Sequence, residues 1–306
     1  MKIVIVGAGF GGLRLARKLN NKPGIEVVLI DRFNHHQFQP LFYQVATAAL
    51  NGSDISFPLR KVFHNSKNVS VRLAELSQIN AADNTVVTSE GNFAYDQLVI
   101  ATGADTNFFG NSNFEKFAWP MKSTVEAMEI RNHILKNFEA ALMEADVLHR
   151  QRLLNIVVVG AGPTGVELSG AIAEMKKYVL PKDYPELDFE AMNIYLLEGG
   201  LKTLAAMSEK SSLQSKNYLE RLGVKVKTNA LMQDYNGKTV FLAVGSSIES
   251  SMVIWAAGIK GNIPTGIDAS LIVRGNRIKV NLQCKVEGTK NIYSIGDVAY
   301  ILIQIV

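Results

Sequence analysis

The chain has 306 residues, of which 47% are hydrophobic, and 32 basic side chains stand against 28 acidic ones. This length suits two globular domains, while the small basic excess, without a run of Lys or Arg, excludes the clustered positive charge of a nucleic-acid-binding protein. One cysteine, Cys284, excludes an intramolecular disulfide, a CxxC redox pair and a cysteine zinc site, and favours a reducing, cytoplasmic compartment. No apolar run approaches the ~18 residues that cross a membrane.

The chain opens with a strand that runs into a glycine-rich turn, IVIVGAGFGG at residues 3–12. A helix pattern follows over 13–20, and then a strand over 26–31, EVVLID, that ends in an acidic residue. This is the context of the dinucleotide-binding fingerprint, in which the first glycine permits a tight turn, the second lets the backbone approach a pyrophosphate and the third allows close helix packing. Asp31 has the spacing of the carboxylate that bonds a ribose 2′-hydroxyl. The three glycines are Gly7, Gly9 and Gly12.

The same pattern returns at an offset of 153 residues, as IVVVGAGPTG over 156–165. A helix pattern and a strand follow again, and the strand NIYLLE at 193–198 ends in Glu198. Farther along each half, LVIATGA at 98–104 is echoed by VIWAAGI at 253–259. One such turn alone is as well explained as a structural loop of a doubly wound sheet, but two in matching context favour two dinucleotide sites. The glycines of the second turn are Gly160, Gly162 and Gly165.

The repeat predicts an α/β protein with two Rossmann-like, glutathione-reductase-like dinucleotide-binding domains, the second inserted into the first. Each domain is expected to hold a parallel sheet covered by helices, with a three-stranded antiparallel excursion. The first should comprise residues 1–112 and 262–306, because the strand patterns after 261 match nothing in the second half, and the second should comprise 113–261.

Two dinucleotide sites imply two dinucleotides, and one natural use is hydride transfer from a mobile nicotinamide to a fixed flavin. We therefore expect FAD in the N-terminal domain and NADH in the inserted one. Glu198 is followed by Gly199 and Gly200 and offers a partner for a 2′-hydroxyl without an adjacent Arg. This favours NADH over NADPH, although Lys202 weakens the preference.

Residues 34–50, NHHQFQPLFYQVATAAL, together with VVGAGPTGVELSGAIAE, WAAGI and YSIGDVA, resemble the type II NADH dehydrogenases. These are single-subunit flavoproteins that pass electrons from NADH to quinone at the membrane without pumping protons. The resemblance covers the chain to about residue 299. It implies an FAD-dependent NADH:quinone oxidoreductase, peripheral on the cytoplasmic face of the cell membrane, and it is compatible with a homodimer.

The resemblance also implies roles outside the two fingerprints. The segment from Pro40 would pack beside the isoalloxazine ring, and Thr47 would approach the flavin through its hydroxyl or its backbone. Glu167, in the first turn of the second helix, would lie near the nicotinamide and the flavin, so Thr47 and Glu167 are the catalytic candidates. Further cofactor-binding candidates are Arg32 beside Asp31, the turn Ala101, Thr102 and Gly103 around the adenosine side of FAD, Gly258 in the matching second turn, and Asp297, aimed at the ribityl chain.

Simpler explanations exist for several of these residues. Thr164 and Glu167 fit the T-x-x-E pattern of a capping box, which needs no catalytic role. The segment 37–48 also fits an apolar loop packed on a sheet. The neighbours His35 and His36 are better explained as a solvated pair at a strand end than as a metal site, so no metal is expected. With one cysteine, the chain lacks the residues that disulfide reductases and sulfide:quinone oxidoreductases use.

The chain departs from the family after Ala299. Residues 300–306, YILIQIV, stand where the family continues with a helix rich in Ala and Gln that lines the flavin and quinone site, so the C-terminal region is expected to be lacking. Two alternatives to the quinone reductase follow. One is a truncated, non-catalytic flavoprotein remnant, and the other is a soluble NADH oxidase or diaphorase that uses oxygen or small acceptors.

Overall fold

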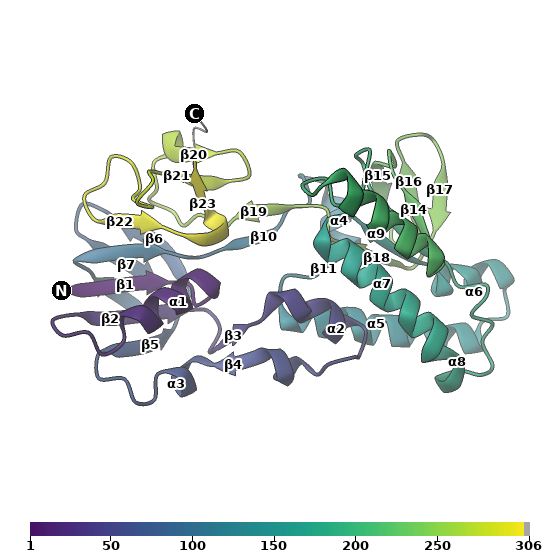
Figure 1. Ribbon diagram of the computed structural model, residues 1–306, viewed down its shortest axis with the longest axis horizontal. Coiled ribbons are helices and arrows are strands. Elements are labelled where there is room, and N and C mark those ends of the chain that lie inside the picture. Colours follow the sequence, from purple (N-terminus) through teal and green to yellow (C-terminus); the bar gives the residue numbers. More distant parts are fainter. Residues whose placement is uncertain (303–306) are drawn as a thin grey trace. The chain divides into compact units, whose positions relative to one another are not determined.

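The computed structural model describes residues 1–302, which form two compact units (Figure 1). Unit 1 comprises 1–37, 56–105 and the residues from 259 onward, and unit 2 comprises 38–55 and 106–258. Both segments of unit 2 therefore lie within the sequence of unit 1, and the larger one contains the second copy of the repeat.

The boundaries differ from those predicted. Residues 38–55 and 106–112 were expected in the first domain, but they pack with unit 2, whereas residues 259–261 belong to unit 1. The first segment changes unit because Phe42, Val45 and Ala46 are buried in a core cluster with Ile130 and Phe138. Of the predicted range 262–306, residues 303–306 lie outside the part that the structure describes.

Unit 1 is built on a parallel sheet in the order β22–β9–β1–β2–β5. Alternate residues of its central strands enter two different core clusters, Ile3 and Ile5 on one face and Val4 and Val6 on the other. Both faces are buried, which explains why these strands read as unbroken apolar runs. The strands are β1 (Lys2–Val6), β2 (Glu26–Asp31), β5 (Val69–Leu73), β9 (Gln97–Ile100) and β22 (Ile292–Ser294).

The predicted antiparallel excursion of unit 1 is present as the sheet β6–β7–β8. Strand β23 begins at Ala299 and pairs in parallel with β21. The remaining elements of the unit are α1 (Phe10–Leu19), β3 (His35–Gln37), β4 (Ser56–Pro58), α3 (Leu59–Val62), β6 (Leu76–Asn80), β7 (Thr85–Thr88), β8 (Gly91–Ala94), β10 (Ala104–Thr106), β19 (Ile259–Gly261), η3 (Ala269–Leu271), β20 (Ile272–Val273), β21 (Arg277–Val280), η4 (Gly296–Val298) and β23 (Ala299–Ile301).

Unit 2 repeats the plan, with a parallel sheet in the order β11–β18–β12–β13–β14 and an antiparallel excursion β15–β16–β17. The residues of β12 and β18 are all buried, and the sheet lies between two core clusters. The strands are β11 (Trp119–Pro120), β12 (Ile156–Val159), β13 (Ile194–Leu197), β14 (Val224–Lys227), β15 (Met232–Tyr235), β16 (Thr239–Leu242), β17 (Ser247–Glu249) and β18 (Met252–Trp255).

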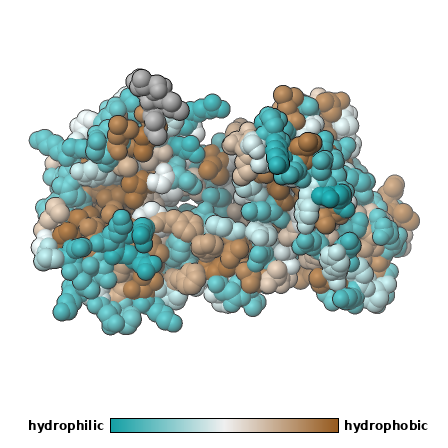
Figure 2. Space-filling view, in the orientation of Figure 1, coloured by the Kyte–Doolittle hydropathy of each residue, from teal (hydrophilic) through white to brown (hydrophobic). Residues whose placement is uncertain are grey.

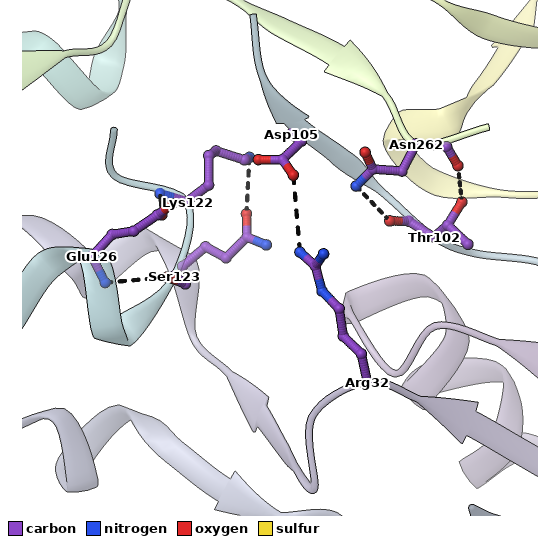
Figure 3. A network of polar contacts seen from close by, with 8 residues as sticks. Arg32, Thr102, Asp105, Lys122, Ser123, Glu126 and Asn262 are labelled. Atoms are coloured by element: carbon purple, nitrogen blue, oxygen red, sulfur yellow. Dashed lines mark hydrogen bonds and ion pairs between the residues drawn. The ribbon is translucent and has the colours of Figure 1, made fainter. Parts of the chain in front are cut away.

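Helices α5 and α7 pack on this sheet, and α2 packs on both of them. Helix α5 begins with a side-chain cap, since Ser123 Oγ accepts the Glu126 backbone N–H at 3.1 Å (Figure 3). No described helix combines the length and the apolar character of a membrane span. The helices of unit 2 are η1 (Gln39–Leu41), α2 (Phe42–Ala46), η2 (Gly52–Ile55), α4 (Ser112–Phe117), α5 (Thr124–Met143), α6 (Val147–Leu154), α7 (Pro163–Tyr178), α8 (Leu180–Asp183) and α9 (Glu209–Arg221).

Candidate functional site

The candidate residues of unit 1 gather at one edge of its parallel sheet. The glycine turn follows β1, Asp31 ends β2, the turn 101–103 follows β9, and η4 follows β22. Because the carboxyl ends of parallel strands lie at the same edge, the fold brings together residues almost 300 positions apart. This edge is where open α/β sheets bind their ligands.

The candidates of unit 2 show the same arrangement. The second glycine turn follows β12, Glu198 follows β13, and the turn that ends in Gly258 follows β18. The order of strands changes direction beside β12, the strand that leads into the glycine turn, so the site lies at the switch point of the sheet.

In the first turn, the structure itself requires two of the three glycines. A Cβ on Gly7, where φ is +103°, would lie 2.1 Å from the Ala101 carbonyl oxygen, and one on Gly12 would lie 1.8 Å from the Gly7 carbonyl oxygen. A Cβ on Gly9 would have no atom within 4 Å. The middle glycine therefore borders open space and is not needed for packing.

The second turn repeats this division. A Cβ on Gly160 would lie 2.6 Å from Ala257 Cα and one on Gly165 1.9 Å from the Gly160 carbonyl oxygen, while Gly162 has no atom within 4 Å. Gly9 and Gly162 are the N-caps of α1 and α7, and neither helix has a side-chain cap. Uncapped N–H groups next to open space fit an anionic group such as a pyrophosphate.

The two carboxylates beside the turns make equivalent contacts. Asp31 accepts the Ala8 N–H at 2.6 Å and the Phe33 N–H at 2.7 Å. Burial raises the pKa of the Asp31 carboxyl above its ordinary value. In unit 2, Glu198 accepts the N–H groups of Ala161 and Gly200, both at 2.8 Å.

Each oxygen of these carboxylates uses one of its lone pairs on a backbone N–H and keeps capacity for another donor. The carboxylates therefore hold the glycine turns in place and are still able to accept a ribose hydroxyl.

The turn after β9 is tied to the returning chain (Figure 3). Thr102 Oγ1 donates to the Asn262 carbonyl oxygen at 2.5 Å, and Asn262 Nδ2 donates back to the Thr102 carbonyl at 3.4 Å. The Arg32 guanidinium lies 4.0 Å from the Asp105 carboxylate and over the Phe33 ring. The Thr102 hydroxyl proton is thus engaged in the bond to Asn262 and is not available to a ligand. The Arg32 side chain is half-exposed at the sheet edge.

Asp297 and Gly258 occupy the expected ends of strands. Asp297 lies in η4 with an exposed side chain, so its carboxylate is accessible at the edge of the unit 1 sheet. A Cβ on Gly258 would lie 2.6 Å from the Phe109 ring. A side chain at Gly258 would thus require the exposed Phe109 ring to move, and the contacts of Gly258 and Asp297 with a cofactor stay predictions.

The segment from Pro40 to Thr47 lies in unit 2, in η1 and α2. The Thr47 backbone N–H and hydroxyl both donate to the Tyr43 carbonyl oxygen, at 3.1 and 2.9 Å. The backbone N–H thus closes the end of a helix, and the approach of Thr47 to the flavin through its hydroxyl or its backbone stays a prediction. Its buried hydroxyl is available to a ligand as an acceptor.

We expect Ala48→Gly to stabilise the protein by about 1 kcal/mol. Ala48 follows the end of α2 with φ of +60°, and the N–H groups of Ala48 and Ala49 bond to the carbonyls of Val45 and Gln44. This is a Schellman motif, whose left-handed position normally holds glycine. Urea denaturation of the variant and of the wild type gives the difference, with Ala49→Gly as the control that should not stabilise.

Glu167 does not form the capping box. Helix α7 begins at Pro163 after the N-cap Gly162, so Thr164 lies inside the first turn and Glu167 one turn farther on. Glu167 is exposed, and desolvation raises the pKa of its carboxyl. It lines an open groove of about 1150 Å³ between α7 and α9, with residues that include Tyr43, Glu174 and Tyr218. The surface over α9 is largely hydrophilic (Figure 2).

His36 was expected to be solvated with His35, and this expectation is wrong for His36. Its side chain is buried, and Nδ1 lies 2.9 Å from the Ala8 carbonyl oxygen. His36 and Asn262 are contacts of the candidate site that sequence reasoning missed. The alternation of β3 hinted that one of two adjacent histidines faces inward, but the sequence contained no sign of its partner.

Within residues 1–302 no group of three or more His, Cys, Asp or Glu side chains is arranged to hold a metal ion.

The fold and the paired turns define a protein with two Rossmann-like dinucleotide-binding units, one inserted into the other. The chain belongs to the pyridine nucleotide-disulphide oxidoreductase family, whose model matches residues 1–306, and within it to the type II NADH:quinone oxidoreductases. The resemblance found in the sequence is thereby confirmed.

Two curated relatives and one solved structure illustrate the similarity. The type II NADH:quinone oxidoreductases NdhA and Ndh of Mycobacterium tuberculosis are each 36% identical over 98% and 97% of this chain, which spans 66% and 67% of their lengths. The structure of NDH2 from Plasmodium falciparum in complex with NADH is similar with a TM-score of 0.87 at 25% identity, over 98% of this chain and 64% of that one. The chain therefore spans about two thirds of the length of these relatives.

Proposed function

We propose that this protein is an FAD-dependent NADH:quinone oxidoreductase, with FAD bound by unit 1 and NADH by unit 2. The duplicated turn carries the proposal: in each unit a glycine without a close neighbour stands beside a carboxylate with unused acceptor capacity. The names of the relatives support the choice of substrates, since they include NADH and quinone.

In unit 1, the N–H groups at the start of α1 would bind the pyrophosphate of FAD, and Asp31 would accept a ribose hydroxyl. Arg32 would add positive charge near the phosphates, and the turn 101–103 and Asp297 would contact the rest of the cofactor. When bound, FAD supplies a centre that takes a hydride from the nicotinamide and gives two electrons to an acceptor.

In unit 2, the start of α7 would bind the pyrophosphate of NADH, and Glu198 would bond the hydroxyls of its ribose. Hydride transfer needs no acid or base, so Glu167 would act through its charge. A carboxylate near the nicotinamide favours the positively charged oxidised ring. Because Glu167 belongs to unit 2, together with the second glycine turn and Glu198, we assign the nicotinamide end of NADH to this unit.

The proposal is tested by mixing FAD-loaded protein with NADH without oxygen and recording the flavin absorbance. We expect the absorbance to bleach, and to recover when a soluble quinone is added. A protein that binds no FAD would support the non-catalytic remnant instead. Bleaching that only oxygen reverses would support the NADH oxidase alternative.

We expect Glu209→Gln to increase kcat/KM for NADPH by about threefold without changing kcat/KM for NADH. Lys202 is the cation that would bind a 2′-phosphate near Glu198, but it forms a short ion pair with Glu209. Removing the carboxylate releases the Lys202 ammonium, and exposed pairs of this kind are worth about 0.2–1 kcal/mol. Initial rates with both nucleotides measure the ratio, and Lys216, paired with Glu220 on the same helix, provides the control variant Glu220→Gln.

We further propose that quinone reduction takes place at the cytoplasmic face of the membrane, since quinones partition into lipid. The described residues contain no spanning helix, so attachment would be peripheral. Flotation of the purified protein with vesicles that contain quinone tests this association, and light scattering tests the expected homodimer.

A further inference from the structure

His36 contacts the glycine turn of unit 1 from a strand outside the parallel sheet. It is the central residue of β3, paired with Phe57 of β4, and its side chain is 7% exposed. Its Nδ1 lies 2.9 Å from the Ala8 carbonyl oxygen, and its ring meets the Phe10 ring edge-on at 5.1 Å. A carbonyl oxygen only accepts, so Nδ1 carries a proton and donates it to Ala8.

Ala8 is held from both sides. Its N–H donates to Asp31 at 2.6 Å and its carbonyl accepts from His36. A trans peptide is planar, so the carbonyl of Ala8 and the N–H of Gly9 point in opposite directions. A donor that fixes the Ala8 carbonyl toward β3 therefore also turns the Gly9 N–H away from β3. Gly9 is the residue of the turn that borders open space.

The second turn holds the equivalent peptide with a different donor. The Ala161 N–H donates to Glu198 at 2.8 Å, and the Ala161 carbonyl accepts the backbone N–H of Leu204 at 2.8 Å. Leu204 makes this bond with φ of +47°, in the left-handed region that leucine rarely adopts. A strained residue is retained where the surrounding structure requires it. Both copies thus orient the same peptide, by an imidazole in unit 1 and by a strained backbone in unit 2.

We propose that His36 is a positioning residue that orients the Ala8–Gly9 peptide so that the Gly9 N–H binds a phosphate of FAD. The inference rests on the proposed function, because it takes FAD as the ligand of unit 1. His36 acts through Ala8 and need not touch the cofactor. Nothing in the positions of the fingerprint glycines indicates this residue, since it lies 27 residues beyond Gly9 on another strand.

The test compares FAD affinity among variants that keep, misplace or remove the donor. His36→Asn places an amide N–H at the position of Nδ1, His36→Gln moves it farther out, and His36→Phe keeps a ring without a donor. We expect the dissociation constant of FAD to rise about tenfold in H36F and H36Q, the effect of one lost hydrogen bond to a buried carbonyl. H36N should stay within about threefold of the wild type. Titration of apo-protein, followed by flavin fluorescence, measures these constants.

Two controls distinguish the bond from general damage. His35→Phe changes the neighbouring histidine, which bonds to Asn34, and should leave FAD affinity unchanged. Binding of NADH to unit 2 should be unchanged in every variant. The inference would be overturned if H36Q bound FAD as tightly as the wild type, if H36N and H36Q lost FAD affinity equally, or if NADH binding fell in parallel. If H36F does not fold, the comparison of H36Q with H36N still tests the inference. A wild-type protein that binds no FAD would refute the proposed function instead.

Discussion

Gly12→Ala is expected to destabilise the apo-protein by about 3 kcal/mol or more, because the new methyl would lie 1.8 Å from the Gly7 carbonyl oxygen. Gly9→Ala should leave the stability within about 0.5 kcal/mol of the wild type, since its methyl meets no atom within 4 Å. The same variant should weaken FAD binding roughly a hundredfold, because the methyl blocks the backbone that would approach the phosphates. Urea denaturation of apo-protein and FAD titration measure the two effects separately.

The second turn supplies a matched pair of controls. Gly165→Ala, with its methyl 1.9 Å from the Gly160 carbonyl oxygen, should destabilise like Gly12→Ala. Gly162→Ala should preserve the fold and FAD binding but weaken NADH binding. If Gly9→Ala binds FAD as tightly as the wild type, the open space beside Gly9 is not a phosphate site.

Asp31→Asn and Glu198→Gln are expected to differ most in which nucleotide they affect, FAD or NADH. Each amide replaces one carboxylate oxygen with an NH₂ group that faces a backbone N–H, and a charge-assisted hydrogen bond of about 1.5–3 kcal/mol is lost. Asp31→Asn should weaken FAD binding about 10- to 100-fold and leave NADH binding unchanged. Glu198→Gln should weaken NADH binding to a similar extent and leave FAD binding unchanged. Fluorescence titrations with each nucleotide measure both constants for both variants.

Asp96→Asn is the control for these substitutions. Asp96 accepts the Lys2 N–H at 2.6 Å, but it precedes β9 and so lies at the opposite edge of the sheet from the candidate site. Its replacement should change stability only. If Asp31→Asn instead weakened NADH binding, or if both variants affected both nucleotides equally, the assignment of one dinucleotide to each unit would be wrong.

The glycine turns show why so much of the site was predictable. A Cβ at Gly12 clashes with the Gly7 carbonyl five positions earlier, so this requirement is local to the turn, whereas a Cβ at Gly7 clashes with the Ala101 carbonyl beyond the neighbouring strand β9. The acidic residue at the end of the following strand is fixed by the register of two adjacent parallel strands. Strand, turn, helix and strand are consecutive in the chain, so a sequence pattern identifies them.

The misassigned residues depended on contacts between distant segments. Residues 38–55 lie between two segments of unit 1 in sequence, but their apolar face is buried against helix α5, which lies about 90 positions farther on. The T-x-x-E pattern at Thr164 looked like a capping box until the structure put the N-cap at Gly162. Both donors of Thr47 are used at the end of α2.

The sequence by itself determined the two-unit fold, the two glycine turns and their carboxylates. These features belong to a motif that is contiguous in the chain and occurs twice, so its pattern is visible in the sequence. The sequence also determined the family, through residues 34–50 and the second turn. Only the tertiary structure decided which unit holds the segment from Pro40, that Thr47 keeps its hydroxyl as an acceptor, and that His36 reaches the carbonyl of Ala8. Those outcomes depend on burial and hydrogen bonding between segments that lie far apart in the sequence. The spacing of residues along the chain therefore does not predict them.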